Sequence, residues 1–405
     1  MTKGNPDGAG EALVIDDLAL RRAREGLDDG DSPRPVRRVF AAVRIAMTED
    51  YRHVEHADEP VDPANFAPFI DWGAMEVQRR RLDALGFGIA EAMDTAQRFA
   101  IGWDLAAELV WRTGRLGLKH GFVAGVGEDS APAGASDEDL VAAVAEQAEV
   151  VCAQGGIPVL LPLVRLAEER ADEDRFVRVY TSIIDAVEGP LLLHWLGEPF
   201  RDVLKHLFPG GSFSRILAHD PAKVRGAKIS LLDAARERAI RREARANEQF
   251  VFTGDDFSFG ELIGGDAPDA REERASLGAE SLPLGEFSHA LLGVFDAIAA
   301  PMAAALAWLA RGDRARYDAI VGPCEALGRI LFEPPTEHYK AGLAFLAWID
   351  GRQATPQLPL HAERARPREH FARVLRAAVA AGAIENPEIA AERWRLWCAS
   401  PSDAD

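Results

Sequence analysis

The segment VRGAKISLLD, from Val224 to Asp233, has the pattern of a buried strand over Val224–Ser230, which carries one lysine and runs into a helix. Lys228 stands between Ala227 and Ile229. Burying an ammonium group costs free energy unless a carboxylate pairs with it or the amine has a chemical purpose. The chain also uses lysine sparingly, with six lysines against forty arginines. A lysine in this strand is therefore unlike a solvent-exposed lysine that serves only solubility.

Seven further apolar segments have the same strand-like pattern, so the chain has eight candidate strands. The other seven are Arg38–Met47, Phe87–Met93, Gly121–Gly127, Ile157–Val164, Gly189–Trp195, Gln249–Asp255 and His289–Phe295. Most of them begin roughly 30 residues apart, which is the length of one strand–helix–strand unit. Eight apolar strands that each lead into a helix predict a closed (β/α)8 barrel, the TIM barrel, rather than an open doubly wound sheet. No Gly-x-Gly-x-x-Gly opens the first helix, which weakens the dinucleotide-binding alternative.

The segments between the strands have helical periodicity. Stretches such as Gly73–Gly86, Asp137–Gly156 and Glu173–Gly189 carry apolar residues three and four positions apart, with glycine where a helix would end. We predict three regions in the chain. They are a flexible N-terminal arm over residues 1–35, the barrel over 36–311 with an insertion at about 260–288, and a helical C-terminal extension over 312–405.

The composition limits the classes of partner. A net charge of −19 at pH 7 would repel nucleic acid and anionic membranes. Cys152, Cys324 and Cys398 are far apart and odd in number, which argues against a disulfide framework and fits a reducing cytoplasm. The most apolar long segment, Ala297–Ala310, is interrupted by Pro301 and is shorter than the roughly 18 residues of a membrane span. We therefore expect a soluble, cytoplasmic protein that binds neither nucleic acid nor membrane.

In TIM barrels the chemistry takes place at the carboxyl ends of the strands. Here those ends carry one lysine (Lys228), one histidine (His194) and seven acids: Glu91, Asp94, Glu128, Asp129, Asp255, Asp256 and Asp296. The other candidate residues at these ends are Arg44, Thr48, Trp195 and Ser230. A neutral lysine amine can attack a ketone to form an imine, which then accepts electrons from a neighbouring bond. Burial favours the neutral amine that this chemistry needs. The structural alternative is that Lys228 pairs with Asp255 or Glu91.

Five motifs, in this order along the chain, resemble those of the dihydrodipicolinate synthase and N-acetylneuraminate lyase superfamily of class I aldolases. FVAGVG (122–127) resembles its third-strand Gly-x-Gly, GAKIS (226–230) its sixth-strand lysine motif and VFTGDD (251–256) its seventh-strand Gly-x-Asp turn. LLGVFDAIAAPMAAALAWLARGD (291–313) resembles its eighth strand and following helix, and EHYKAGLAFLAWIDG (337–351) its C-terminal helical segment. The matched residues are Gly125, Gly127, Lys228, Gly254, Asp255 or Asp256, Pro301 and Lys340. The resemblance covers about Val39 to Leu360 and implies that Lys228 forms a Schiff base with the substrate.

Two departures from the family pattern bear on the substrate. The family's fifth strand ends in a Tyr-Asn pair whose tyrosine relays protons, whereas LLHWLG places His194 and Trp195 there. The family's second-strand Gly-Thr-Thr-Gly-Glu, which binds the carboxylate of a 2-keto acid, is replaced by EAMDTAQ (91–97). The two acids of that segment disfavour pyruvate and favour a neutral polyol or a keto sugar.

Histidine can take over the proton relay, because imidazole titrates near neutral pH. The tyrosines of the chain all lie outside the predicted strand ends: Tyr51, Tyr180, Tyr317 and Tyr339. The structural alternative for His194 is a core histidine, and the alternative for Trp195 is a packing role. The alternative for Glu91 and Asp94 is that they balance the charge of Arg44 or of Lys228.

We predict a Schiff-base lyase or aldolase, cleaving a carbon–carbon or carbon–oxygen bond of a 2-keto acid or keto sugar, with Lys228 and His194 as catalytic residues. The predicted substrate-binding residues are Glu91, Asp94, Gly125, Gly127, Trp195, Ser230, Gly254, Asp255 and Asp296. No metal or cofactor is expected, and we expect a homo-oligomer, either a dimer or a tetramer. One alternative is a barrel isomerase or epimerase that binds Mg²⁺ or Mn²⁺ through Glu91, Asp94, His194 and Asp255. Another is a non-catalytic barrel that binds a ligand or partner.

Overall fold

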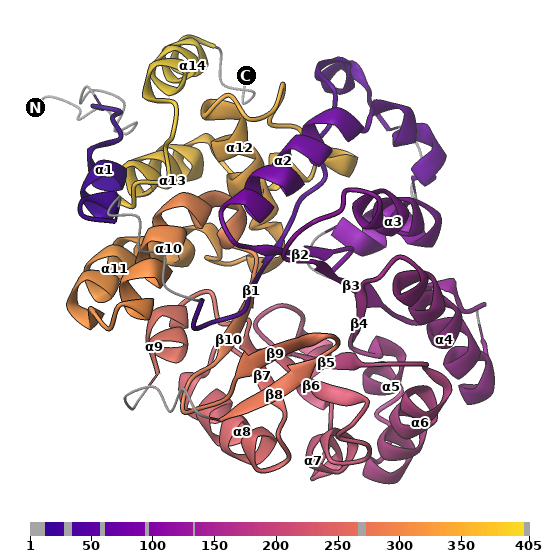
Figure 1. Cartoon of the computed structure of the whole chain (residues 1–405). Helices are drawn as coiled ribbons and strands as arrows, with labels where there is room; N and C mark the ends of the chain where they lie inside the picture. Colours follow the sequence, from indigo (N-terminus) through magenta and orange to yellow (C-terminus); the bar gives the residue numbers. More distant parts are fainter. Residues whose placement is uncertain are drawn as a thin grey trace, which may run out of the picture.

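The computed structural model describes residues 13–27, 35–56, 61–93, 97–132, 134–265 and 273–400. Eight parallel strands close into a barrel (Figure 1), in the order β1-β10-β7-β6-β5-β4-β3-β2. The barrel strands are β1 (Val39–Ala42), β2 (Gly88–Glu91), β3 (Phe122–Val126), β4 (Ile157–Leu160), β5 (Leu191–Leu196), β6 (Val224–Ser230), β7 (Phe250–Thr253) and β10 (His289–Leu292). Each lies within or overlaps one of the eight predicted segments. The predicted TIM barrel is therefore confirmed.

Helices surround the barrel and continue beyond it. They are α1 (Leu18–Arg24), α2 (Trp72–Ala84), α3 (Phe99–Gly114), α4 (Asp137–Ala153), α5 (Val164–Glu168), α6 (Glu173–Ala186), α7 (Ser212–Leu217), α8 (Ala234–Ala246), α9 (Phe259–Gly264), α10 (Phe295–Ala310), α11 (Arg314–Leu331), α12 (Lys340–Ile349), α13 (Arg368–Ala380) and α14 (Pro387–Ala399). Several begin at a polar residue whose side chain accepts a hydrogen bond from the backbone N–H three positions later. These caps are Asp71, Ser136, Asp172, Asp233 and Asp313.

The strands of the barrel separate two apolar layers. Phe40, Val123, Leu192 and Phe252 belong to a cluster inside the barrel. Strand residues that face outward, such as Ala227 and Ile229 on either side of Lys228, pack instead with the surrounding helices. Because successive side chains of a strand point to opposite faces, each strand contributes to both layers.

A β-bulge near the start of β6 sets which of its residues face inward. Leu191 and Leu192 of β5 pair with Val224 and Gly226 of β6, so Arg225 is an extra residue in that strand. Val224 packs in the outer layer, and without the extra residue strict alternation would also turn Lys228 outward. The bulge shifts the alternation by one position and points Lys228 into the barrel.

The predicted insertion closes the amino end of the barrel. It contains the antiparallel hairpin of β8 (Arg274–Leu277) and β9 (Glu280–Pro283). Leu277 and Leu282 pack with the interior cluster, and Arg225 at the start of β6 donates from Nε to the Ser276 carbonyl at 2.8 Å. The carboxyl ends of the strands are therefore the end of the barrel at which a ligand can enter.

Part of the predicted N-terminal arm is ordered against the C-terminal helices. Within residues 1–35 the structure contains α1, and Trp308 Nε1 of α10 donates to the Ala23 carbonyl at 2.9 Å. For this segment the prediction of a loose arm is wrong, because Leu20 and Ala23 are buried. Helices α11 to α14 form the predicted extension, seen in orange and yellow in Figure 1. Among the described residues, no helix combines the length and apolarity needed to cross a lipid bilayer.

Candidate active site

Lys228 lies on the inner face of β6, close to the carboxyl end of the strand. Its Cα is in register with His194 of β5 and Phe252 of β7, and the side chain is only 4% exposed. Gly254, at the end of β7, leaves room for the lysine stem, since a Cβ there would stand 2.9 Å from Lys228 Cε and closer still to Ser230 Oγ. Ser230 and Gly254, two of the predicted substrate-binding residues, therefore lie beside Lys228. Gly254 has no side chain there, and this leaves room for the lysine.

His194 faces the barrel interior and is fully buried. Its Nε2 lies 3.2 Å from Ser230 Oγ, so the imidazole of β5 and the hydroxyl of β6 form a hydrogen-bonded pair. Ser230 is two positions after Lys228 on the same strand. This placement keeps His194 as a candidate for proton transfer, because the ring does not point into the helix layer.

A second buried lysine lies over the mouth of the barrel. Lys340, at the start of α12, donates from Nζ to the Ala42 carbonyl of β1 at 2.6 Å. Burial lowers its pKa to about 7, with Arg44 and Lys228 acting in the same direction and Asp296 and Asp256 opposing it. The site therefore contains two amines whose charges interact, one from a barrel strand and one from the C-terminal extension.

Asp256 is the acid that interacts with both amines. Burial raises its pKa to about 7, and this is opposed by a hydrogen bond from the Val294 N–H at 3.1 Å and by the charges of Lys228 and Lys340. Asp255, the residue predicted to contact substrate, instead orders the turn after β7. Its Oδ1 accepts hydrogen bonds from the N–H groups of Phe257 and Ser258 at 2.9 and 3.0 Å. Of the two acids that the GDD motif left open, Asp256 is the one at the lysine.

Tyr339 also reaches the mouth of the barrel, although it is far from every strand in sequence. Its ring stacks on Phe332 with centroids 4.1 Å apart and fills the space over Gly293, where a Cβ would stand 2.9 Å from the hydroxyl oxygen. Gly293 directly follows β10. Tyr339 lies outside the predicted strand ends in the sequence, but the fold brings it to the end of β10.

Two predicted site residues point away from the mouth. Glu91 occupies the outer face of β2, where Arg79 of α2 binds both of its oxygens at 2.7 and 3.0 Å. Trp195 lies on the outer face of β5, with its ring 4.5 Å from that of Phe213. Both face outward because they are one position away from inward-facing residues, Ala90 and His194, and side chains alternate along a strand. Glu91 follows the charge-balance alternative, with Arg79 as its partner, and Trp195 follows the packing alternative.

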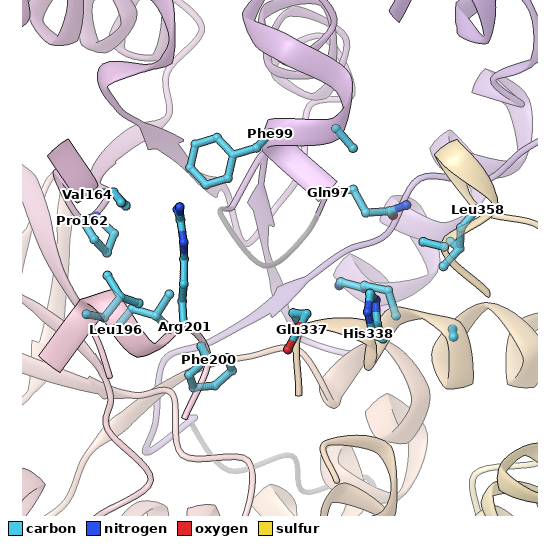
Figure 2. A pocket seen from close by; sticks show the side chains of 15 residues that line it. Gln97, Phe99, Pro162, Val164, Leu196, Phe200, Arg201, Glu337, His338 and Leu358 are labelled. Atoms are coloured by element: carbon cyan, nitrogen blue, oxygen red, sulfur yellow. The ribbon is translucent and has the colours of Figure 1, made fainter. Parts of the chain in front are cut away.

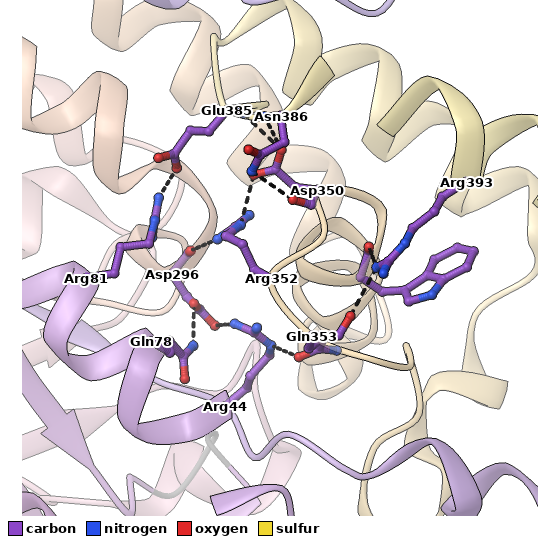
Figure 3. Close-up of polar contacts among 11 residues, drawn as sticks. Arg44, Gln78, Arg81, Asp296, Asp350, Arg352, Gln353, Glu385, Asn386 and Arg393 are labelled. Atoms are coloured by element: carbon purple, nitrogen blue, oxygen red, sulfur yellow. Dashed lines mark hydrogen bonds and ion pairs between the residues drawn. The ribbon is translucent and has the colours of Figure 1, made fainter. Parts of the chain in front are cut away.

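Asp296 joins the barrel to the extension (Figure 3). Its carboxylate pairs with Arg44 and accepts a hydrogen bond from Gln78 Nε2 at 2.6 Å. Arg44 in turn donates to Gln353 Oε1 at 2.9 Å. Burial opposes ionisation of Asp296, but the charges of Arg44 and Lys340 and the Arg44 hydrogen bond bring its pKa down to about 2. Both carboxylate oxygens are used in this network, which disfavours the predicted substrate contact.

The remaining predicted residues come from β3 and from the segment after β2. Gly125 is packed against the Ala92 carbonyl and Leu161, since a Cβ there would stand 2.4 Å from the Ala92 oxygen. The Gly127 N–H donates to Gln147 Oε1 at 2.8 Å. Asp94 lies outside the described residues. Gly125 and Gly127 therefore serve the packing and hydrogen bonding of β3.

Of the four ligands predicted for a metal-dependent isomerase, the three that the structure describes are not brought together. Glu91 and His194 lie on opposite faces of the barrel wall, and the Asp255 carboxylate is bonded to its own turn. In the parts of the chain that the structure describes, no three His, Cys, Asp or Glu side chains are grouped as a metal ion requires.

A cavity of about 230 Å³ opens at the carboxyl ends of β4 and β5 (Figure 2). Its lining includes Gln97, Phe99, Pro162, Leu196, Phe200 and Lys340. Lys228 is not part of the lining. Lys340 connects the two, since it lines the cavity and its charge interacts with Lys228.

The family described as "Protein of unknown function (DUF993)" matches residues 16–400 of the sequence. The chain belongs to this family. No curated protein matches the sequence. The function of the chain therefore has to be argued from its own residues.

Solved structures resemble the chain in fold. A catalytic lysine mutant of sialic acid aldolase from Ruminococcus gnavus has a TM-score of 0.57 at 13% identity, over 90% of this chain and 98% of that one. Dihydrodipicolinate synthase from Cyanidioschyzon merolae, with lysine bound, has a TM-score of 0.57 at 14% identity, over 86% and 99%. N-acetylneuraminate lyase from Fusobacterium nucleatum, complexed with pyruvate, has a TM-score of 0.55 at 13% identity, over 84% and 95%. The fold is therefore that of the family which the five motifs resemble, and identities this low show the fold alone.

Three side chains of the site were missed or not assigned from the sequence. The GDD motif leaves Asp255 and Asp256 open, and only Asp255 is predicted as a site residue. Lys340 enters the prediction through the family resemblance alone, and Tyr339, next to it in EHYK, lies outside the predicted strand ends. A charged residue beside an aromatic one, at the start of an otherwise apolar helix, was the available signal for a functional segment.

Proposed function

We propose that the protein is a Schiff-base lyase or aldolase that acts on a 2-keto acid or keto sugar through Lys228. The observation that carries the proposal is a buried amine on the inner face of β6, at the end of the barrel that the hairpin leaves open. His194, Ser230 and Asp256 supply an imidazole, a hydroxyl and a carboxyl around it. Nucleophile, proton carriers and an acid in one buried site are what imine chemistry requires.

In this mechanism the Lys228 nitrogen attacks the ketone carbon of the substrate, and the carbonyl oxygen leaves as water. For carbon–carbon cleavage, the protonated imine draws toward nitrogen the electron pair of the bond between its α- and β-carbons, while a base takes the proton of the β-hydroxyl. That bond breaks, the β-carbon leaves as the carbonyl of the first product, and an enamine remains. A proton delivered to the enamine carbon restores the imine, which water then hydrolyses to release the second product. Lys228 needs to be neutral when it attacks, and burial of the side chain favours that state.

Borohydride trapping tests the proposal. The protein is incubated with a panel of 2-keto acids and keto sugars, reduced, digested and analysed by peptide mass. We expect a reduced adduct on the peptide that contains Lys228. Lys340 is the internal control, because it is the other buried lysine at this end of the barrel. An adduct on Lys340 with none on Lys228 would refute the assignment.

Two variants distinguish the candidates for proton relay. His194→Asn is expected to lower kcat by about 100-fold or more, the usual contribution of general acid–base catalysis, while trapping at Lys228 persists. The plot of kcat against pH should also lose the inflection that arises from titration of His194. If Tyr339 is the relay, Tyr339→Phe will show this loss and His194→Asn will not. Tyr317→Phe is the matched control, since the Tyr317 hydroxyl is equally buried but donates to the Gly260 carbonyl at 2.9 Å in the helix layer.

A further inference from the structure

A short segment of the C-terminal extension forms one wall of the cavity. We call residues 358–365, which include the 3-10 helix η8 (Pro359–Ala365), the strap. Leu358, which is fully buried, and Ala362 line the cavity. Figure 2 shows Leu358 on the side of the cavity away from Pro162 and Leu196. The position of the strap therefore sets how wide the cavity is on this side.

The backbone of the strap is strained and depends on contacts with the segment after β1 (residues 49–56). Leu360 and His361 have φ angles of +60° and +49°, in the left-handed region that costs free energy for residues other than glycine. The Leu360 N–H donates to Tyr51 Oη at 3.0 Å, and the His361 ring stacks on the Tyr51 ring with centroids 4.7 Å apart. The strap therefore keeps its conformation only while these side chains hold it.

Both ring nitrogens of the buried His361 face hydrogen-bond acceptors. Nε2 lies 2.6 Å from the Val54 carbonyl oxygen, and Nδ1 lies 3.1 Å from Glu363 Oε1. A carbonyl and a carboxylate only accept, so each ring nitrogen has to donate. A neutral imidazole carries one N–H, and only the imidazolium carries two. The closed strap therefore requires a protonated His361, with Glu363 as its counter-charge.

Loss of the ring proton would remove one of these hydrogen bonds. A lone pair of the ring would then face an oxygen lone pair, which is unfavourable in a buried site. Glu363 Oε2 also accepts the Leu358 N–H at 2.9 Å, so a displaced carboxylate would release the residue that lines the cavity. Since imidazole is the side chain that titrates between about pH 5 and 8, the strap is sensitive to pH in this range.

Other charged and titratable groups surround the strap, and most of them are already engaged. Arg364 of the strap pairs with Glu55 at 2.8 and 3.0 Å, and Tyr51 Oη lies 2.8 Å from His56 Nε2. On the cavity side, η7 (Thr336–His338) and α12 contribute Glu337, His338 and Lys340. His56 and His338 are the other histidines of this set, so they provide the controls for a role of His361.

We propose that the strap is a gate of the cavity that the protonation of His361 operates. With His361 protonated, the strap is held against the segment after β1, and Leu358 closes this side of the cavity. When His361 loses its proton, the strap detaches and the cavity widens beside Lys340. A ligand therefore enters and leaves more easily at alkaline pH. The gate does not depend on imine formation at Lys228.

Hydrogen exchange of the natural chain at about pH 5.5 and about pH 8 tests the gate. The protection factor of the peptide that contains Leu358 and Leu360 corrects for the intrinsic pH dependence of exchange. Because opening releases a proton, we expect this factor to be about tenfold or more lower at the higher pH. Carbene footprinting, whose chemistry does not depend on pH, should label Leu358 about twofold or more strongly there. An unchanged protection factor, or unchanged labelling of Leu358, would overturn the proposal.

Two variants separate the proton from the rest of the strap. In Glu363→Gln the amide oxygen keeps the hydrogen bond from Leu358 N–H, and the amide N–H can donate to an unprotonated Nδ1 of His361. The strap should therefore stay protected at both pH values. His361→Gln lacks the second donor, so the protection factor should be about tenfold lower already at the acidic pH and no longer change with pH.

His338→Gln is the matched control, because His338 lines the same cavity from η7. This variant, like His56→Gln, should show the pH dependence of the natural chain. A pH dependence that persists in Glu363→Gln would refute the gate, and this variant tests it even if His361→Gln does not fold. Loss of the pH dependence in His338→Gln or His56→Gln, with its persistence in His361→Gln, would assign the titration to another histidine and refute it as well.

Discussion

Lys228→Met is expected to abolish both the borohydride adduct and bond cleavage, with kcat lowered by about 10⁴-fold or more. Removing a residue that forms the covalent intermediate costs this much, because the other groups of the site then have no imine to act on. Lys228→Arg should be equally inactive although it keeps the positive charge, because a guanidinium stays protonated and cannot attack a carbonyl. Turnover of the panel substrates, followed by product analysis, is the measurement.

The comparison of variants separates loss of chemistry from loss of structure. Methionine fits an apolar interior, so Lys228→Met should unfold at a temperature no lower than that of the parent protein. Lys205→Met is the matched control, since Lys205 is exposed and pairs with Asp202 three positions earlier, and its activity should stay normal. Cleavage that survives in Lys228→Met would exclude imine catalysis by this residue.

The barrel could be predicted from the sequence because its strands are short apolar runs separated by helical periodicity. For β6 even the limits, Val224 and Ser230, coincide with the prediction. The faces of the strands were harder to predict. In β2 the run Gly-Ile-Ala-Glu is buried on both sides, as parallel barrel strands are, so no polar alternation shows which way Glu91 points. The partner that decides it, Arg79, lies on the preceding helix.

The site depends on contacts that no local pattern contains. Lys340 and Tyr339 reach the mouth only because the C-terminal extension folds back over β1 and β10. The inward direction of Lys228 depends on a bulge whose only sequence signal is the glycine at 226. The chemistry-bearing lysine was therefore predictable from the motif, whereas its partners needed the tertiary structure.

The same extension is held to the barrel by the network of Asp296, and the second large effect is expected there. Asp296→Asn should lower the free energy of unfolding by about 3–5 kcal/mol, because it leaves the buried Arg44 guanidinium without its counter-charge. Asp318→Asn is the matched control. Asp318 pairs with Arg314 on the exposed face of α11, and such pairs contribute only about 0–1 kcal/mol. Urea unfolding of the three proteins at neutral pH gives the comparison.

The pH dependence of this difference provides the sharper test. The pKa of Asp296 is lowered to about 2 in the folded protein, below its value of about 3.9 in an unfolded chain. A carboxylate with a depressed pKa stabilises the fold above the unfolded pKa, and this stabilisation is lost as the pH falls through the folded one. The gap in unfolding free energy between the natural chain and Asp296→Asn should therefore be constant above about pH 5 and narrow between about pH 4 and 2. A gap that stays constant down to pH 2 would show that the lost stability comes from packing and not from the charge of Asp296.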